Sequence, residues 1–299
     1  MQKTDQIETA QTPGEWEAAG GAGAALVNGD RYPIDRPGDR ALLHAIEQAR
    51  EGLAHDGCAR IGQFINPEWH TALAEETTGL APEALFSTQS YTPYGTPADE
   101  SFPETHPRRR EHRTTSGNVT RDLIPETSLL QTLYQRADFK AFIAACLDAE
   151  EIYEFADPMR GLTINVMPDG TSLGWHFDAN EFVVSLMTRR ADAGGIFEYA
   201  PGIRAPGNEN YDAVRAVLDG ESDLVKSLDL QVGDLQIFKG RYSMHRVAPL
   251  RGERHTVIFG YSRQPGFIGS VESTRRVYGR VMQAHIDAEN KRHDDGLTD

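Results

Sequence analysis

The fold is decided by two stretches of the chain, GWHFD at 174–178 and SMHRVAPLRGERHTVIFGY at 243–261. Each stretch places histidine, aspartate or arginine beside a short run of β-branched and aromatic residues. Runs of that composition favour β-strands over helices. Both stretches therefore predict strands that carry polar, chemically active side chains.

Similar short runs recur on both sides of these stretches, from residue 161 to residue 262. Turn signals such as Pro168-Asp169-Gly170 separate them. The predicted strands are LTINVM (162–167), WHF (175–177), FVVSLM (182–187), GIFEYA (195–200), KSLDL (226–230), LQIFKG (235–240) and RHTVIFGY (254–261). Short connections, without helices between most of the strands, predict antiparallel pairing in a barrel or jelly roll.

The chain on either side of this β region has helical periodicity. Asp39 is placed to cap a helix that runs to about residue 54, and apolar residues recur at helical spacing over 129–147 and 271–290. In the first half, residues 87–120 are rich in Ser, Thr, Pro, Gly and Arg. This composition predicts a long loop, of a length that is usually mobile or functional.

These observations predict an α+β protein, with N-terminal helices packed on a β core and a helix at the C-terminal end. One domain is expected over residues 31–299, behind a mobile arm at 1–30. Its expected parts are a mainly helical half with the long loop (31–160), the β core (161–262), and the C-terminal helix with its tail (263–299).

The composition restricts the class of protein and its partners. Of the 299 residues, 39% are hydrophobic, which is enough for a folded core, and the formal net charge is −15. Such a charge opposes binding to nucleic acid and to anionic membranes. Cys58 and Cys146 fit buried thiols in a reducing compartment, and no apolar run approaches the roughly 20 residues of a membrane span. We therefore expect a soluble cytoplasmic protein without a nucleic-acid or membrane partner.

Histidine followed two residues later by aspartate occurs three times, and geometry separates the three pairs. On a strand, His176 and Asp178 share one face. The pair at 285 and 287 lies on a predicted helix, where the two side chains point roughly 200° apart. The pair at 293 and 295 lies in a polar tail. The first pair alone is therefore placed to bind a metal ion.

A third ligand is expected from His245, which follows the LQIFKG run. Two imidazoles and one carboxylate make up the facial triad that suits Fe(II), and this triad leaves about three coordination positions open. A bidentate 2-oxo acid and O2 would occupy these positions. The set contains no thiolate, which disfavours structural zinc.

The 2-oxo acid would need a cation for its second carboxylate, and Arg254 opens the next strand-like run. Thr256 shares a strand face with Arg254, so a guanidinium and a hydroxyl are placed to bind one carboxylate together. Arg251 competes for this role, but it lies in a predicted turn and is expected to face water. His255 alternates to the opposite face and is expected to be structural or exposed.

Together these motifs resemble the iron(II)/2-oxoglutarate-dependent oxygenases. The motifs are GWHFD (174–178), GGIFEY (194–199), GDLQIF (233–238) and SMHRVAPLRGERHTV (243–257). With HPRRREHRTTSG (106–117), the β region further resembles the branch that contains hydroxylases and radical halogenases of free amino acids. The resemblance implies a double-stranded β-helix of the jelly-roll or cupin type. It also implies that the three predicted ligands bind Fe(II), and that Arg254, Thr256 and Asn165 bind 2-oxoglutarate.

Asp178 bears on whether the reaction is halogenation or hydroxylation. The halogenases of this branch have Gly or Ala in place of the metal-binding carboxylate, which opens a position for chloride, whereas this chain keeps Asp178. The resemblance therefore implies hydroxylation of an unactivated carbon of a small polar substrate such as a free amino acid, with consumption of O2 and release of succinate and CO2. Desaturation, epoxidation or cyclisation stay open as outcomes of the same chemistry. So do a cupin-like metalloenzyme without a 2-oxo acid and a non-catalytic metal-binding module.

Candidates for substrate binding come from the long loop and from the residue before the first metal ligand. As a lid, the loop at 87–120 would bring Arg109, Arg110 or His112 to a substrate carboxylate, whereas a solvated loop would leave them in water. Trp175 would either stack on the substrate or pack beside the metal-binding strand. The oligomeric state stays open.

Overall fold

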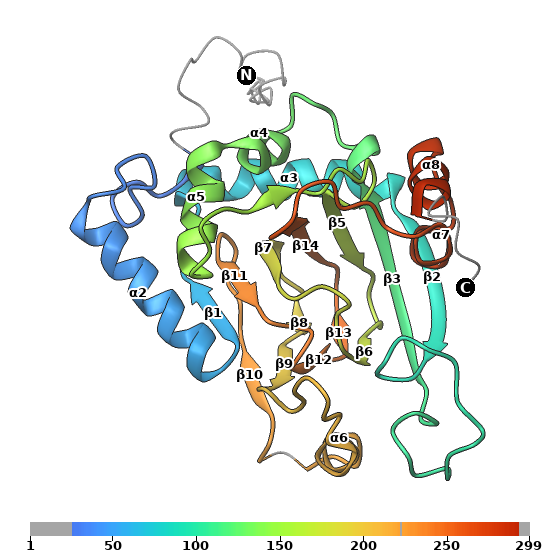
Figure 1. Ribbon diagram of the computed structural model, residues 1–299. Coiled ribbons are helices and arrows are strands. Elements are labelled where there is room, and N and C mark those ends of the chain that lie inside the picture. Colours follow the sequence, from blue (N-terminus) through green and yellow to red (C-terminus); the bar gives the residue numbers. More distant parts are fainter. Residues whose placement is uncertain (1–25, 222, 293–299) are drawn as a thin grey trace, which may run out of the picture.

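The computed structural model describes residues 26–221 and 223–292, and its main element is a seven-stranded sheet (Figure 1). Every neighbouring pair of strands in this sheet runs antiparallel. In order across the sheet, the strands are β1 (Cys58–Ile61), β11 (Leu235–Phe238), β7 (Val183–Arg189), β14 (Arg254–Phe259), β5 (Leu162–Met167), β3 (His112–Thr120) and β2 (Leu85–Tyr91).

A second, four-stranded sheet packs against one face of the first. Its strands, in order, are β10 (Lys226–Leu228), β9 (Phe197–Ala200), β12 (Met244–Val247) and β6 (Leu173–His176). The rings of Phe197 and Phe238, one from each sheet, lie 5.0 Å apart between centroids, in one buried cluster with Met167 and Val247. Two further pairs are formed by β4 (Tyr153–Glu154) with β15 (Tyr261–Ser262), and by β8 (Ala193–Gly194) with β13 (Leu250–Arg251).

Helices cover the other face of the large sheet, at the left and top of Figure 1. They are α2 (Arg40–His55), α3 (His70–Leu80), α4 (Leu129–Gln135) and α5 (Ala137–Cys146). Their apolar side chains and those of the strands form the larger core. Helix α2 begins where predicted, because the Asp39 side chain accepts a hydrogen bond from the Ala41 amide at 2.9 Å. The connections contain η2 (Pro67–Trp69), η3 (Ala81–Glu83), η4 (Arg121–Leu123) and α6 (Tyr211–Leu218).

The mixture of helices and antiparallel sheets confirms the predicted α+β class. Residues 31–160 are less helical than expected, because they supply β1, β2 and β3 to the large sheet. The loop expected over 87–120 is correspondingly short, since β2 and β3 leave only 92–111 between them. These two strands are rich in Ser and Thr and lack the apolar alternation that predicts strands. Thr is nevertheless β-branched, and Asn118 on the inner face of β3 borders a polar cavity.

The start of the predicted single domain also differs from expectation. Residues 1–25 of the expected arm lie outside the described residues. Leu26 and Val27, however, are buried, and Val27 pairs with Ile65 in an isolated β-bridge. The chain is therefore packed before residue 31, the predicted boundary.

The C-terminal helix predicted over 271–290 is two helices, α7 (Val271–Tyr278) and α8 (Gln283–Arg292). They are separated at Gly279, which ends α7 in the left-handed region with a φ of 68°. The tail at 293–299 lies outside the described residues. Among the helices of the described part, none has the length and apolar character needed to cross a bilayer.

The two cysteines are buried and free, as expected. Burial raises the pKa of Cys58 to about 11 and that of Cys146 to about 12. Both side chains are therefore protonated thiols at neutral pH, and such thiols are poor nucleophiles.

Candidate active site

A cavity of about 280 Å³ contains the predicted metal and co-substrate residues. The small sheet contributes His176 and His245, and the large sheet contributes Asn165, Arg254 and Thr256. The cavity therefore lies between the two sheets. A larger open hollow of about 660 Å³ lies between α2 and α5, and none of the predicted site residues lines it.

The two histidines face each other across neighbouring strands. His245 on β12 is directly opposite His176 on β6, and their ring centroids are 4.1 Å apart. Asp178 follows β6, and its Oδ1 lies 3.8 Å from His176 Nε2 and 3.5 Å from His245 Nε2. The ligand atoms of the three side chains all lie within 4.8 Å of one another, so one metal ion can contact all of them.

Hydrogen bonds to the backbone fix how each imidazole points. His176 Nδ1 donates to the Gly174 carbonyl at 2.8 Å, and His245 Nδ1 donates to the Ser243 carbonyl at 3.0 Å. Because a carbonyl only accepts, the proton of each neutral ring is on Nδ1. Each Nε2 therefore keeps its lone pair and faces the Asp178 carboxylate, as metal-binding histidines do.

One oxygen of the Asp178 carboxylate has no partner among the described residues, and a bound cation would be such a partner. Its Oδ2 is buried and accepts no hydrogen bond from any described residue. Gly240 leaves the space for this oxygen, because a Cβ on that glycine would lie 1.7 Å from Oδ2. An unpaired buried carboxylate is costly. The arrangement therefore fits a divalent cation bound at this position.

The protonation states also suit a metal. Burial, and then the charge of His245, lowers the pKa of His176 to about 4, so that this imidazole is neutral at neutral pH. Burial would raise the pKa of Asp178, but the attraction of His245 and His176 outweighs it and leaves the pKa lowered. A neutral imidazole and an ionised carboxylate are the forms that bind divalent metals.

Arg254 places an uncompensated cation in the same cavity. Its side chain is 4% exposed, its Nη1 donates to Thr256 Oγ1 at 2.6 Å, and its buried Nε has no hydrogen-bond partner in the described part of the chain. It forms no ion pair with a described acidic residue. Burial lowers the pKa of Arg254 to about 10, so that it is still a cation at neutral pH. A buried guanidinium beside a hydroxyl, without an internal anion, fits the carboxylate of a bound ligand.

Asn165 lies where the sequence placed it. It is directly opposite Thr256 in the β5–β14 pair and lines the cavity. Its Nδ2 donates to Asn118 Oδ1 on β3 at 3.3 Å. The predicted co-substrate residues Arg254, Thr256 and Asn165 therefore share one wall of the cavity.

A family model described as Halogenase D matches residues 43–279 of the chain. The match covers more than half of the sequence and includes every residue that lines the cavity. The chain belongs to the halogenase D family. Family membership and the ligand triad together identify an enzyme of the 2-oxoglutarate and Fe(II) oxygenase type, as the sequence motifs predicted.

This halogenase D family member is also similar to several solved structures. An oxidoreductase of the 2OG-Fe(II) oxygenase family from Burkholderia pseudomallei is 16% identical, with 74% of this chain and 92% of that chain covered and a TM-score of 0.48. A Pseudomonas putida prolyl-4-hydroxylase is 15% identical, with 71% of this chain and 96% of that chain covered and a TM-score of 0.46. AviO1 from Streptomyces viridochromogenes Tue57 is 20% identical, with 76% of this chain and 96% of that chain covered and a TM-score of 0.47. No curated protein matches the chain.

The candidate substrate residues of the 92–111 loop do not line the cavity of this family member. Arg109 Nη1 donates to the Phe102 carbonyl at 3.0 Å. Arg110 pairs with Asp219 and donates to the Leu218 carbonyl at 2.9 Å, which ties the end of this loop to the end of α6. Their contact with a substrate stays a prediction.

His112 and Trp175 are also outside the cavity lining. His112 has a buried Nε2 without a hydrogen-bond partner among the described residues, and burial lowers its pKa. Trp175 packs in a buried cluster with Phe177, under the guanidinium of Arg246 at 4.7 Å from the ring centroid. Packing beside the metal-binding strand is thus what the structure shows for Trp175.

Arg251 and His255, the neighbours of Arg254 that were not assigned to 2-oxoglutarate, lie as expected. The Arg251 side chain is 78% exposed. His255 is fully buried on the opposite face of β14, where it contacts Thr77 Oγ1 at 3.2 Å and Glu253 Oε1 at 2.9 Å. His255 is therefore a structural residue.

Several polar residues that line the cavity were not among the predicted site residues. On the large sheet they are Asn118, Thr163, Ser185 and Gln236. The signal for Ser185 and Gln236 was present, because each interrupts an otherwise apolar predicted strand. Arg160 and Tyr278 also line the cavity, but no local pattern marks them.

Proposed function

We propose that this member of the halogenase D family is an Fe(II)- and 2-oxoglutarate-dependent hydroxylase of a small polar substrate, such as a free amino acid. The two facing antiparallel sheets support the double-stranded β-helix that the sequence motifs imply. The observation that carries the proposal is the convergence of two imidazoles, one carboxylate and one unpaired arginine in a single cavity.

His176, Asp178 and His245 would hold Fe(II) through Nε2, a carboxylate oxygen and Nε2. When bound, the iron with 2-oxoglutarate supplies oxidation by O2, with release of succinate and CO2. Arg254 and Thr256 bind the distal carboxylate of 2-oxoglutarate by charge-assisted hydrogen bonds. The two sheets exclude water from the reacting groups.

Asp178 favours hydroxylation over halogenation. Its carboxylate fills the position that is open for chloride in halogenases with Gly or Ala there, and Gly240 gives it the space to do so. Halogenation is the second candidate, because the matching family model is described as a halogenase.

Product analysis separates these reactions. The enzyme is incubated with Fe(II), 2-oxoglutarate, O2 and a panel of free amino acids, in buffer that contains chloride, and products are identified by mass spectrometry. We expect a product heavier by one oxygen atom, formed together with succinate. A chlorinated product would contradict the proposal, and so would a product that has lost two hydrogens without gaining oxygen. Reactions without 2-oxoglutarate serve as the control.

A further inference from the structure

The cavity has two ends, and each end carries an arginine. Both Arg254, which opens β14, and Gly260, which follows it, line the cavity. Six residues of extended chain span about 20 Å. Arg160 lies at the Gly260 end, because a Cβ on Gly260 would be 2.6 Å from the Arg160 carbonyl oxygen. Arg160 and Arg254 therefore stand at opposite ends of the cavity.

The metal triad lies between these ends. Val247 pairs with Leu173 and packs with Met167, the direct neighbour of Arg254 across β5 and β14. His245, two residues before Val247, packs against Phe238 with ring centroids 4.8 Å apart. Phe238 pairs with Val183, the residue before the partner of Phe259, so His245 lies toward the Gly260 end. If 2-oxoglutarate reaches from Arg254 to the iron, as in the proposed function, the substrate occupies the end with Arg160.

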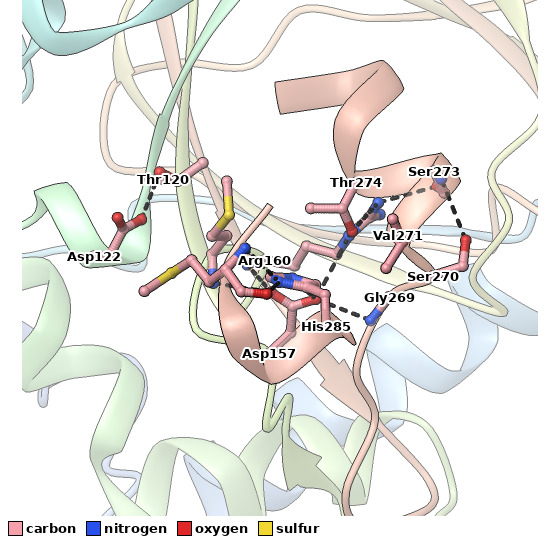
Figure 2. Close-up of polar contacts among 12 residues, drawn as sticks. Thr120, Asp122, Asp157, Arg160, Gly269, Ser270, Val271, Ser273, Thr274 and His285 are labelled. Atoms are coloured by element: carbon pink, nitrogen blue, oxygen red, sulfur yellow. Dashed lines mark hydrogen bonds and ion pairs between the residues drawn. The ribbon is translucent and has the colours of Figure 1, made fainter. Parts of the chain in front are cut away.

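Arg160 is held rigidly at that end (Figure 2). Its Nη2 donates to Ser273 Oγ at 3.0 Å and to Thr274 Oγ1 at 3.2 Å, both on α7. Its guanidinium lies over the ring of Tyr278, 5.2 Å from the centroid. Its Nη1 makes no hydrogen bond to any residue of the described ranges, so two N–H donors are uncommitted.

Asp157 orients Arg160 and leaves its Nη1 uncommitted (Figure 2). The fully buried carboxylate accepts hydrogen bonds from the Arg160 amide at 2.9 Å, the Gly269 amide at 2.9 Å and His285 Nε2 at 3.2 Å. Because an ionised carboxylate only accepts, the hydrogen bond to Asp157 places a proton on His285 Nε2. The Arg160 Nε also forms an ion pair with Asp157 Oδ2, at 3.6 Å. Asp157 thus links α8 to Arg160 and leaves Nη1 available.

Tyr278 offers a second donor beside Arg160. It lines the cavity, and its hydroxyl bonds to none of the residues that the structure describes. Burial raises its pKa, so that the hydroxyl is protonated. Phe155 and Phe182 also line the cavity and provide apolar contact for a carbon skeleton. Phe155 lies at the Gly260 end, because a Cβ on that glycine would be 2.6 Å from its ring.

We infer that Arg160, through Nη1, and Tyr278, through its hydroxyl, bind a carboxylate of the substrate at the end of the cavity opposite the 2-oxoglutarate site. The substrate class is a small carboxylic acid whose carboxylate lies on Arg160 and whose reacting carbon is nearer the iron. The inference rests on the proposed function, because it places the substrate by reference to the iron and 2-oxoglutarate.

The test compares Arg160→Gln with Arg121→Gln. Arg121 is a matched control, because its guanidinium lies 4.8 Å from the ring centroid of Tyr134 and 3.6 Å from Glu154, but outside the cavity. Standard amino acids and their α-carboxamides are assayed for succinate release, and for binding to protein loaded with Ni(II) and 2-oxoglutarate by calorimetry. Comparing Asp with Asn and Glu with Gln distinguishes a side-chain carboxylate from an α-carboxylate.

We expect that only compounds with the recognised carboxylate stimulate succinate release. Arg160→Gln should lower kcat/KM and affinity for the acid about 10- to 100-fold, with little further loss for its amide. Arg160→Lys should recover part of this loss. Tyr278→Phe should lower kcat/KM and affinity for the acid a few-fold, and Arg121→Gln should behave as wild type.

Three results would overturn the inference. They are equal effects of Arg160→Gln and Arg121→Gln, an equal loss for acid and amide in Arg160→Gln, and a panel in which no carboxylate compound binds or stimulates. Failure of the proposed function is a separate result. It is seen in wild-type protein, as absence of the visible charge-transfer absorption of an Fe(II)–2-oxoglutarate complex.

Discussion

Asp178→Ala is expected to abolish turnover of 2-oxoglutarate coupled to the substrate. Removing a residue that only orients a metal ligand typically costs 10- to 100-fold in metal affinity or activity, so loss of a ligand should cost more than about 100-fold. Asp178 is also the one anion among the three side chains that converge here. Its loss leaves two imidazoles, which bind Fe(II) more weakly. Succinate formation and Fe(II) affinity are the measurements.

Two controls separate this effect from misfolding. Asp169→Ala removes an aspartate whose side chain is 61% exposed and which contacts Gly252 and Arg251, so this variant should keep wild-type activity. The metal-free Asp178→Ala protein should unfold at a temperature no lower than wild type, because the deleted carboxylate has an unpaired buried oxygen. Turnover by Asp178→Ala at the wild-type rate would remove Asp178 from the ligand set.

Arg254→Ala is expected to weaken the use of 2-oxoglutarate far more than the binding of substrate. A hydrogen bond to a charged group contributes roughly 1.5–3 kcal/mol, so loss of two of them should raise KM for 2-oxoglutarate about 100-fold or more. KM for each of the two compounds is measured separately by succinate release. The physical reason is that Arg254 is buried at the end of the cavity without an acidic partner among the described residues.

Arg251→Ala is the matched control for Arg254→Ala. Arg251 lies three positions earlier in the chain, but its side chain is 78% exposed and outside the cavity, so its loss should leave both KM values unchanged. Arg254→Lys should keep part of the function, because it keeps the charge and loses the fork of donors. If Arg254→Ala raised both KM values equally, the assignment of Arg254 to 2-oxoglutarate would be wrong.

The site elements that could be predicted from sequence are those set by the two-residue period of a strand. LTINVM was expected over 162–167, and β5 spans Leu162–Met167. The same period placed Arg254 and Thr256 on one face, where they share a hydrogen bond, and placed His255 on the other. The structure also brings His176 and Asp178 to His245, although Asp178 follows the end of β6 and is not placed by the period of that strand.

Features that depend on tertiary contacts were not predictable in this way. Strand β3 borders a polar cavity, so its inner face has no apolar pattern to detect. Strand β12 was missed because it is short and carries the polar residues His245 and Arg246 between apolar ends. Arg160 and Tyr278 meet only because α7 packs over the loop before β5, where Arg160 donates to Ser273 and Thr274.

Anaerobic titration of the wild-type protein with Fe(II) and then with 2-oxoglutarate tests the claim that this cavity holds the two together. We expect a visible charge-transfer absorption that saturates at one iron and one 2-oxoglutarate per chain, and that is absent from Asp178→Ala under the same conditions. Its absence from wild-type protein shown by metal analysis to hold iron would contradict the claim. So would a band of equal intensity in Asp178→Ala.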